Sequence, residues 1–305
     1  MAPETFLPER DVPDLCGKVI FITGGTAGIG KQTIINLAKH SPSHIYFSGR
    51  NYMSADAVIA EVKTAAPDTK LTFVQFDLGS LNSVKEAIAK LEIPRLDILI
   101  CNAGIMAVPL GLTTDGYEIQ FGTNFLGHAL LIHLLLPTLL QHADEPNADP
   151  RVVILTSQGF SAHPVGGIVF KNLRTVQNSP MAGPWIRYGQ SKLAGLLYAR
   201  ELAARYPSIT STSIHPGVIN TGLVTNLSKI NQWMIYLTNV GKSITEDEGT
   251  HNTLWAATSN KSGIVNGEYY EPVGQLGKHA RESKNNKLAK ELWEWTEKEL
   301  QPYVA

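Results

Sequence analysis

The sequence has few cysteines and almost no excess charge. Its 305 residues contain only Cys16 and Cys101, too few for the disulfide framework that stabilises many small secreted domains. Acidic and basic residues nearly balance, with a formal net charge of −1, whereas binding to nucleic acid or to an anionic membrane surface requires a basic patch. We therefore expect a cytoplasmic protein with free thiols and no nucleic-acid partner.

The sequence also lacks a hydrophobic run long enough to cross a bilayer. Residues 1–15 include three prolines and four acidic residues and do not have the apolar core and basic flank of a signal peptide. The most apolar run, 126–140, is interrupted by His128, His133 and Pro137 and is shorter than the ~20 residues that span a membrane. We expect a buried helix there and no integral membrane segment.

The histidines are not arranged as metal ligands. None of the nine shows metal-ligand spacing with cysteines or carboxylates, although metal sites usually draw on such residues at short, characteristic intervals. We therefore predict no metal site and place the histidines in the core or on the surface.

Strand and helix patterns alternate along the chain. Apolar, β-branched runs predict strands at residues 18–23, 44–48, 70–76, 96–101, 151–157 and 209–214. Helical patterns lie between them, at residues 30–40, 53–66, 80–91, 115–140 and 185–206, the fourth broken or bent near Pro137. Strands that alternate with helices of this length predict an α/β fold, with a doubly wound parallel sheet of about seven strands and helices on both faces.

The ends of the chain are expected to differ from this pattern. Three prolines predict an irregular N-terminal arm over residues 1–16. No linker interrupts residues 17–305, so we predict a single domain. A C-terminal helix is expected at about 284–301, where two tryptophans in the run 292–295 should pack against the body of the protein.

A glycine-rich turn follows the first predicted strand and opens a helix. Its residues are Thr23-Gly-Gly-Thr-Ala-Gly28-Ile-Gly30. Backbone N–H groups at a helix start bind phosphate, and glycines let the backbone approach it closely. The turn therefore predicts a dinucleotide site. A plain tight turn stays open, because the spacing is Gly-x-x-x-Gly-x-Gly rather than Gly-x-Gly-x-x-Gly.

The end of the second predicted strand indicates which dinucleotide is bound. An acidic residue there binds the ribose 2′-OH of NAD, whereas a nearby arginine accommodates the 2′-phosphate of NADP. This chain has Ser48-Gly49-Arg50 and no carboxylate at that place. Because a guanidinium offers a planar fork of donors matched to phosphate, we favour NADP(H); a solvated surface arginine is the alternative.

Other notable residues also follow predicted strands. Gly24, Asp77, Asn102, Ser157 and Pro216 each come just after a strand. Ligands of doubly wound sheets bind beyond the carboxyl ends of the strands. These residues are therefore expected to contribute to one shared site.

Tyr188-Gly-Gln-Ser-Lys192 places a tyrosine and a lysine four residues apart on a predicted helix, so they lie on the same face. A nearby ammonium favours the phenolate and lowers the tyrosine pKa from about 10. Such a tyrosine can exchange a proton with an alcohol or carbonyl oxygen. The pair alone occurs often by chance, but its placement after the turn and Ser157 favours a catalytic interpretation.

In this order and spacing, the motifs resemble those of the short-chain dehydrogenase/reductase superfamily over roughly residues 16–300. The matching elements are the glycine-rich turn, Asp77-Leu78, Asn102-Ala-Gly104, Asn124, Ser157, Tyr188-x-x-x-Lys192 and Pro216-Gly-Val-Ile-Asn-Thr221. The sequence is most similar to the retinol-dehydrogenase-like branch and its fungal relatives. That closer likeness rests on Ser-Gly-Arg after the second strand, the 31-residue gap from Ser157 to Tyr188, Glu248-Gly249 and the C-terminal tryptophans.

The resemblance implies a Rossmann fold and a role for each matching residue. Tyr188 would be the general acid in reduction and the general base in oxidation. Lys192 would lower the Tyr188 pKa and bind the nicotinamide ribose. Ser157 would polarise the carbonyl, and Asn124 would hold a water that relays protons through Lys192. One departure is Cys101, where the family often has Asn.

The resemblance also implies the cofactor contacts. They are Gly24, Thr26, Gly28, Ile29, Gly30, Arg50, Asp77, Leu78, Asn102, Ala103, Gly104, Tyr188, Lys192, Pro216, Gly217, Val218 and Thr221. Asp77 would contact the adenine, and Thr221 would bind the nicotinamide carboxamide.

The substrate and partners are less defined. Residues about 222–245 resemble the family's substrate lid, and their apolar, aromatic character favours a lipophilic carbonyl or alcohol; ordinary packing or a subunit contact is the alternative. In the family, helices corresponding to 115–140 and 185–206 often form a dimer interface. A homodimer is therefore expected, unless the C-terminal extension blocks it.

We expect an NADP(H)-dependent oxidoreductase that interconverts a carbonyl and an alcohol on a lipophilic small molecule. Two alternatives stay open. This fold also hosts reductases of C=C or C=N bonds in biosynthetic pathways. A non-catalytic dinucleotide-binding sensor is the other, although such proteins usually lose the Tyr or Lys that this chain retains.

Overall fold

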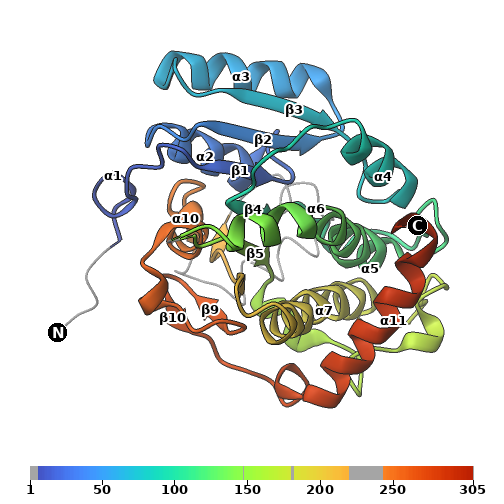
Figure 1. Cartoon of the computed structure of the whole chain (residues 1–305). Coiled ribbons are helices and arrows are strands. Elements are labelled where there is room, and N and C mark those ends of the chain that lie inside the picture. The colour runs from blue at the N-terminus through green and yellow to red at the C-terminus, as the bar shows by residue number, and fades with distance from the viewer. Residues whose placement is uncertain (1–5, 147, 180–181, 220–242, 305) are drawn as a thin grey trace.

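The computed structural model describes residues 6–146, 148–179, 182–219 and 243–304, arranged around one eight-stranded sheet (Figure 1). The strands, in spatial order, are β10 (Gln275–Leu276), β9 (Tyr269–Glu271), β6 (Thr210–Ile214), β5 (Arg151–Leu155), β4 (Ile98–Cys101), β1 (Val19–Ile22), β2 (His44–Gly49) and β3 (Leu71–Gln75). All neighbours are parallel except β10, which is antiparallel to β9. The predicted parallel sheet is confirmed, and two strands whose positions were not predicted, β9 and β10, complete it at one edge.

The helices lie on both faces of the sheet. They are α1 (Pro8–Asp11), α2 (Gly28–Ala38), α3 (Tyr52–Ala65), α4 (Leu81–Ala89), α5 (Ile119–Phe121), α6 (Gly127–Ala143), α7 (Gly183–Arg205), α10 (His251–Thr258) and α11 (Asn286–Val304). A separate pair of short parallel strands consists of β7 (Val218–Ile219) and β8 (Ser243–Ile244).

Successive residues of the central strands belong to two different cores. Ile20 and Ile22 of β1 pack with α2, α3 and α10, whereas Phe21 between them packs with α4, α6, α7 and α11. Side chains of a strand point alternately to opposite faces of the sheet. Because both faces are covered, every position of the strand is apolar, which is why these strands appear in the sequence as continuous hydrophobic runs.

Two local features differ in part from the expectations. The N-terminal arm is not irregular throughout, because Pro8 starts the helical turn α1, where its missing N–H costs nothing. The helix expected to break or bend near Pro137 continues through that residue to Ala143. Its irregularity is a π-turn, Gly122–Leu126, which joins α5 to α6.

The helical stretch Ile119–Ala143 is the one part of the described residues that is long and apolar enough to cross a membrane by length and composition. Within its most apolar window, 67% is buried inside the protein. Packing in the core therefore accounts for the apolar character of this helix, as expected for the run 126–140.

The C-terminal helix α11 packs across α7 and α6 (Figure 1). Leu292 and Trp293 are buried, and the Trp293 ring stacks on Tyr198 of α7 with centroids 4.9 Å apart. The expected packing of this helix is confirmed. Part of the surface that α6 and α7 were expected to offer to a second subunit is covered by α11, and the homodimer stays a prediction.

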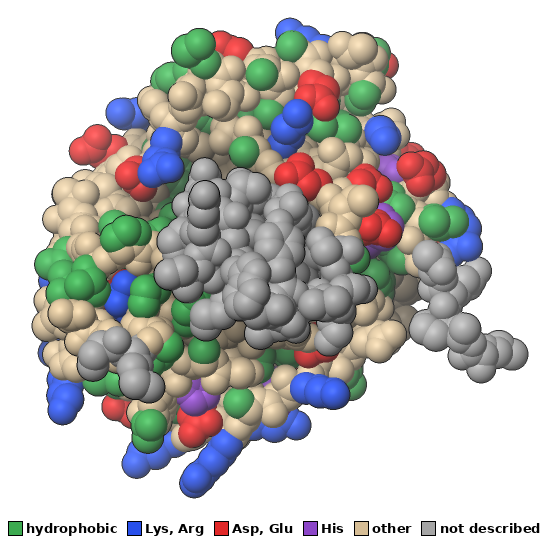
Figure 2. All heavy atoms as spheres, turned by 180° about the vertical axis from the view of Figure 1, so that it is seen from behind, with side chains coloured by type: hydrophobic (Ala, Val, Ile, Leu, Met, Phe, Trp, Pro, Cys, Tyr) green, Lys and Arg blue, Asp and Glu red, His purple; other side chains and the backbone are tan. Residues whose placement is uncertain are grey.

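The face of the molecule that points away from the viewer in Figure 1 is shown in Figure 2. On it, acidic and basic side chains are interspersed rather than gathered by sign. This mixed surface agrees with the formal net charge of −1.

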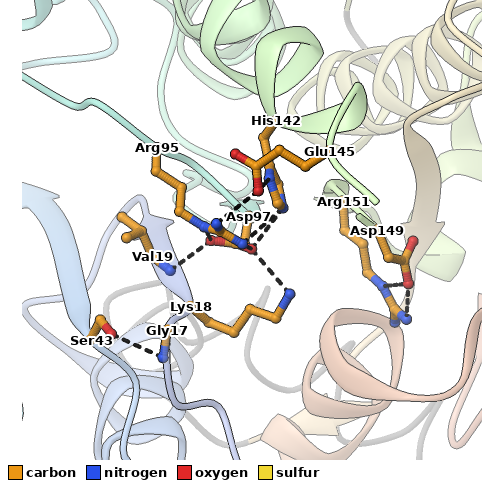
Figure 3. Close-up of polar contacts among 10 residues, drawn as sticks. All are labelled: Gly17, Lys18, Val19, Ser43, Arg95, Asp97, His142, Glu145, Asp149 and Arg151. Atoms are coloured by element: carbon orange, nitrogen blue, oxygen red, sulfur yellow. Dashed lines mark hydrogen bonds and ion pairs between the residues drawn. The ribbon is translucent and has the colours of Figure 1, made fainter. Parts of the chain in front are cut away.

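A buried carboxylate organises the amino-terminal edge of the sheet (Figure 3). Asp97, directly before β4, accepts hydrogen bonds from Nε and Nη2 of Arg95 at 2.8 and 2.9 Å. Lys18 Nζ lies 3.1 Å from it, His142 Nε2 lies 2.8 Å from it, and the Val19 N–H donates at 2.9 Å. These contacts join the starts of β1 and β4 to the end of α6.

Candidate active site

The glycine-rich turn lies at the carboxyl end of β1 and leaves no room for side chains. Gly24 has a φ of +67°, in the left-handed region that favours glycine. A Cβ on Gly30 would lie 2.3 Å from the Gly24 carbonyl oxygen and 2.5 Å from Asn102 Nδ2. The start of α2 is thus held directly against the end of β1.

The first turn of α2 fits a phosphate group. Its N-cap residue, Ala27, makes no side-chain hydrogen bond to the helix, and the first turn contains no acidic residue. The unpaired N–H groups and positive end of a helix are a ready site for an anion. The residues at this turn therefore fit a dinucleotide pyrophosphate.

The end of β4 is tied to the same turn. The Thr23 hydroxyl accepts hydrogen bonds from the N–H groups of Asn102 and Ala103 at 2.9 and 3.0 Å. Asn102 Nδ2 donates to the Thr23 carbonyl at 2.8 Å. The expected convergence of Gly24 and Asn102-Ala103-Gly104 is therefore present, and it is built mainly from backbone groups.

The ends of β2 and β3 form the next part of this edge. A Cβ on Gly49 would lie 2.7 Å from Thr26 Cγ2, so the strand end packs against the glycine-rich turn. Arg50 follows with an exposed side chain, while Gln75 Nε2 donates to its carbonyl at 2.8 Å. Asp77 is also exposed, and its Oδ1 accepts from the Gly79 N–H at 2.8 Å. Both charged side chains are accessible beside the turn.

Ser157 and Tyr188 are brought together by two glycines. Ser157 follows β5, and Tyr188 lies buried in α7. A Cβ on Gly159 would lie 2.9 Å from Tyr188 Cε1, and one on Gly189 would lie 2.7 Å from the backbone of Ala162 and His163. This close approach of α7 to the turn after β5 brings the Ser157 hydroxyl beside the Tyr188 phenol, whose pKa it acts to lower.

Lys192 is buried one turn further along α7. Its Nζ donates to the Leu155 carbonyl at 2.9 Å and lies 5.8 Å from the centroid of the Tyr188 ring. A Cβ on Gly104 would lie 3.4 Å from the same Nζ. The ammonium therefore stands between the end of β5 and the loop that follows β4.

Asn124 lies in the π-turn and is fully hydrogen-bonded through its side chain. Its Oδ1 accepts from the Ile105 N–H at 2.8 Å, and its Nδ2 donates to the Ile105 carbonyl and the Ser191 hydroxyl, each at 2.9 Å. The Ser191 hydroxyl in turn donates to the Tyr188 carbonyl at 2.8 Å. Asn124 thus joins the loop after β4 to α7.

Burial determines the protonation of the tyrosine and lysine. It raises the pKa of Tyr188 to about 12, with the hydrogen bond to Ser157 acting in the opposite direction. It also lowers the pKa of Lys192 to about 8. The expectation that Lys192 would depress the Tyr188 pKa below its ordinary value was wrong, because burial raises that pKa and outweighs the hydrogen bond to Ser157, which lowers it.

A buried ion pair supports the same region and was not predicted. Arg187, next to Tyr188, has its Nε 3.1 Å from Glu118 Oε1, and neither side chain is exposed by more than 2%. Arg187 Nη2 also donates to the Val108 carbonyl at 3.0 Å, while Glu118 accepts from the Phe121 N–H at 2.7 Å. The pair joins α7, α5 and the loop after β4.

Some predicted residues are placed only in part. Pro216 and Gly217 follow β6 at the same edge of the sheet, and Gly217 has a φ of +103°. Val218 begins β7. Thr221 and residues 222–242 of the expected lid lie outside the described residues. Gly28 and Ile29 begin α2, whereas Leu78, after β3, is buried in the core and its carbonyl faces Gly127 of α6.

The arrangement can carry out proton transfer to an oxygen beside a dinucleotide site. Tyr188 provides a protonated phenol at neutral pH, and Ser157 provides a second hydroxyl next to it. The glycine-rich turn, at the end of β1 and separated from β5 by β4, provides N–H groups for a phosphate. Together these groups suit the transfer of a hydride and a proton to the two ends of a C=O bond.

Comparisons with known proteins agree with this chemistry. A family model described as short chain dehydrogenase matches residues 18–159. The chain is 35% identical over 304 residues to short-chain dehydrogenase/reductase drtF of Aspergillus calidoustus, covering 95% of each protein. It is 33% identical to human polyprenol dehydrogenase, covering 95% of this chain and 86% of the relative. It is 32% identical to retinol dehydrogenase 12 of Mus musculus, covering 91% and 84%.

The fold is also shared with a solved structure. A crystal structure of a protein from Mycobacterium paratuberculosis matches with a TM-score of 0.74 at 28% identity, covering 96% of this chain and 97% of that one. The similarity to known proteins thus extends over nearly the whole chain, both in sequence and in three dimensions.

Proposed function

The chain belongs to the short-chain dehydrogenase/reductase family of oxidoreductases, and we propose that it interconverts a carbonyl and an alcohol on a lipophilic small molecule, using NADP(H). The observation that carries this proposal is the approach of Ser157 to the buried Tyr188 and Lys192, at the same edge of the sheet as the glycine-rich turn. A protein that only bound the dinucleotide would need the turn but not a buried proton donor next to it.

Tyr188 is the proposed proton donor for reduction. With a pKa raised to about 12 by burial, its phenol is protonated at neutral pH and can donate to the carbonyl oxygen. The Ser157 hydroxyl can donate to the same oxygen and stabilise the negative charge that develops there. NADP(H), when bound, supplies or accepts the hydride.

Lys192 and Asn124 are the proposed path for the proton that Tyr188 must regain. Lys192 has a pKa of about 8, so it exchanges protons readily near neutral pH. The Asn124 side chain is hydrogen-bonded to Ile105 and Ser191, and its carbonyl accepts from His128 Nδ1 at 2.9 Å. In the proposed path, a relay water lies between Asn124 and Lys192.

The lipophilic substrate is proposed from two observations. Polyprenol dehydrogenase and retinol dehydrogenase 12, which are similar to this chain, are named for long apolar alcohols. Residues 222–245 have the apolar, aromatic composition of a wall for such a molecule. The same composition argues against a small charged substrate.

The direct test is a panel of lipophilic ketones, aldehydes and the corresponding alcohols, with NADPH or NADP⁺ and absorbance of the reduced cofactor as readout. We expect turnover of at least one carbonyl–alcohol pair, with apolar members preferred over polar ones of equal size. Tight NADPH binding without turnover of any compound in the panel would instead support a non-catalytic dinucleotide-binding sensor. Turnover restricted to conjugated C=C or C=N substrates would support the other reductase class.

Arg50 is the proposed recognition group for the 2′-phosphate. Its side chain is exposed at the end of β2, beside the turn. Arg50→Ala is expected to weaken NADPH binding by about 10- to 100-fold, because a charge-assisted bond to phosphate contributes roughly 1.5–3 kcal/mol. NADH binding should change by less than about threefold, since that cofactor lacks the phosphate.

The measurement for Arg50 is the Kd of each cofactor by fluorescence titration. Lys31→Ala is a suitable control, because Lys31 is another basic residue of the α2 region and is paired with Glu61 at 2.6 Å. Equal weakening of NADPH and NADH by Arg50→Ala would show that Arg50 does not recognise the 2′-phosphate.

A further inference from the structure

His128 is buried between the end of β1, where the glycine-rich turn begins, and the π-turn that contains Asn124. It lies in the first turn of α6 and is 3% exposed. Its Nε2 is 2.8 Å from the Thr23 hydroxyl at the end of β1, and its Nδ1 is 2.9 Å from the carbonyl oxygen of Asn124 in the π-turn. Both ring nitrogens therefore have a partner, and each partner belongs to a different part of the site.

The hydrogen bonds around Thr23 determine the tautomer of this histidine. The Thr23 oxygen already accepts from the N–H groups of Asn102 and Ala103, so its own proton is directed to His128 Nε2. A carbonyl oxygen can only accept, and the proton between His128 and Asn124 therefore resides on Nδ1. Burial lowers the pKa of His128 to about 4, which keeps the ring neutral, with one donor and one acceptor.

A continuous chain of hydrogen bonds runs through the ring. From the glycine-rich turn it passes through Thr23 and His128 to the backbone of Asn124. The Asn124 side chain continues it to Ser191, whose hydroxyl bonds the carbonyl of Tyr188. The position of the tyrosine helix is thereby linked to the segment that fits the cofactor phosphate.

We propose that His128 is a positioning residue that couples the dinucleotide-binding turn to the helix carrying Tyr188 and Lys192. The inference rests on the proposed function, because it assigns His128 to the alignment of that same reaction. His128 does not exchange a proton with substrate. It holds the glycine-rich turn and the π-turn at a fixed distance. A cofactor bound at the glycine-rich turn is thereby aligned with Tyr188 on α7, which the π-turn contacts through Asn124 and Ser191.

Two substitutions test the two hydrogen bonds of the His128 ring separately. In His128→Asn, the amide nitrogen can reproduce the Nδ1 bond to Asn124 but is too short to reach Thr23. In His128→Gln, the amide can reach Thr23 but does not reproduce the Nδ1 geometry. Because coupling needs both ends, each variant is expected to lower kcat/KM about 10- to 100-fold, as small misplacements of reacting groups do, and to weaken NADPH binding about tenfold.

The matched control is His142→Asn. His142 is a buried histidine of the same helix, 2% exposed, but it contacts Asp97 at the opposite edge of the sheet. Its loss should lower stability without changing kcat/KM or NADPH affinity per folded molecule. If the His128 variants behave like His142→Asn in both measurements, His128 is a structural core residue and the proposal is overturned.

A double-variant cycle with Thr23→Val tests the link itself. Groups that interact directly show non-additive effects, so Thr23→Val combined with His128→Asn should lose less than the product of the single losses, by about fivefold or more. Strict additivity would refute the coupling. The cycle is also measured on NADPH affinity, which does not require turnover. If the wild-type protein were inactive on every carbonyl, the proposed function would be refuted. The double-variant cycle on NADPH affinity would still decide the role of His128.

Discussion

Replacement of Tyr188 by Phe is expected to lower kcat for carbonyl reduction by about 10²- to 10⁴-fold, with little change in NADPH affinity. The substitution removes only the hydroxyl that the proposed reaction uses as acid, and such proton transfer contributes rate factors of this size. The ring itself should stay in place, because it packs edge-on against Trp185, with centroids 6.3 Å apart, and lies close to Gly159.

The measurement is steady-state turnover of the best substrate from the carbonyl panel, together with NADPH titration. Tyr198→Phe provides the control, since Tyr198 is also a buried tyrosine of α7 but stacks on Trp293 of α11, outside the site. Ser157→Ala should give a smaller loss of about 10²- to 10³-fold, as loss of one oxyanion donor does. Undiminished turnover by Tyr188→Phe would exclude the tyrosine as the acid.

Replacement of Asp97 by Asn is expected to lower the free energy of unfolding by about 2–4 kcal/mol while leaving turnover per folded molecule unchanged. Removing one member of a buried ion pair typically costs about 3–5 kcal/mol. The effect should be somewhat smaller here, because the Arg95 side chain that faces Asp97 is 35% exposed and water can partly compensate its charge.

The loss should depend on pH. Burial alone would raise the pKa of the Asp97 carboxyl, but the hydrogen bonds from Arg95, Val19 and Lys18 outweigh it, and the pKa is lowered. A carboxyl with a depressed folded pKa contributes stability above its unfolded pKa of about 3.9, and this is lost as pH falls through the folded pKa. The difference between wild type and Asp97→Asn should therefore be full at pH 7 and shrink below about pH 4.

Urea unfolding at several pH values measures this difference. Glu145→Gln is the matched control, because Glu145 accepts from the same Arg95 at 2.9 Å but is 49% exposed. Exposed pairs contribute about 1 kcal/mol or less. An equal loss in the two variants, or a stability difference that persists unchanged at pH 3, would contradict the role assigned to Asp97.

The sheet was predictable because its physical cause is visible in the sequence. Strands buried on both faces are usually rich in apolar residues, and β1 and β4 appear as continuous apolar runs. The carboxyl ends of parallel strands lie at one edge, which placed Gly24, Asn102 and Ser157 together in advance. Strands β9 and β10 were missed because β9 has only three residues and the two residues of β10, Gln275 and Leu276, are exposed and carry no pattern.

The parts of the site that were missed depend on contacts between distant segments. Arg187 and Glu118 are far apart in sequence and pair only after α5 and α7 pack. Gly159 and Gly189 look like ordinary loop and helix glycines, and only the packed structure shows that neither has room for a Cβ. A nearby Lys192 suggested a lowered Tyr188 pKa, but burial, which a sequence motif does not report, determines its direction.

The π-turn has a consequence for helical phase. An α-helix advances about 100° per residue, and a turn closed by an i→i+5 bond contains one residue more than an α-turn. The apolar stripe of α6 is therefore offset by about one residue from the face on which Asn124 lies. Gly122 is the first residue of the π-turn, and Gly127 follows its last residue. A Cβ on Gly127 would lie 2.4 Å from the Leu78 carbonyl oxygen. Along this one helical stretch, Asn124 bonds Ile105 and Ser191 in the site, while the leucines of α6 are buried in the core.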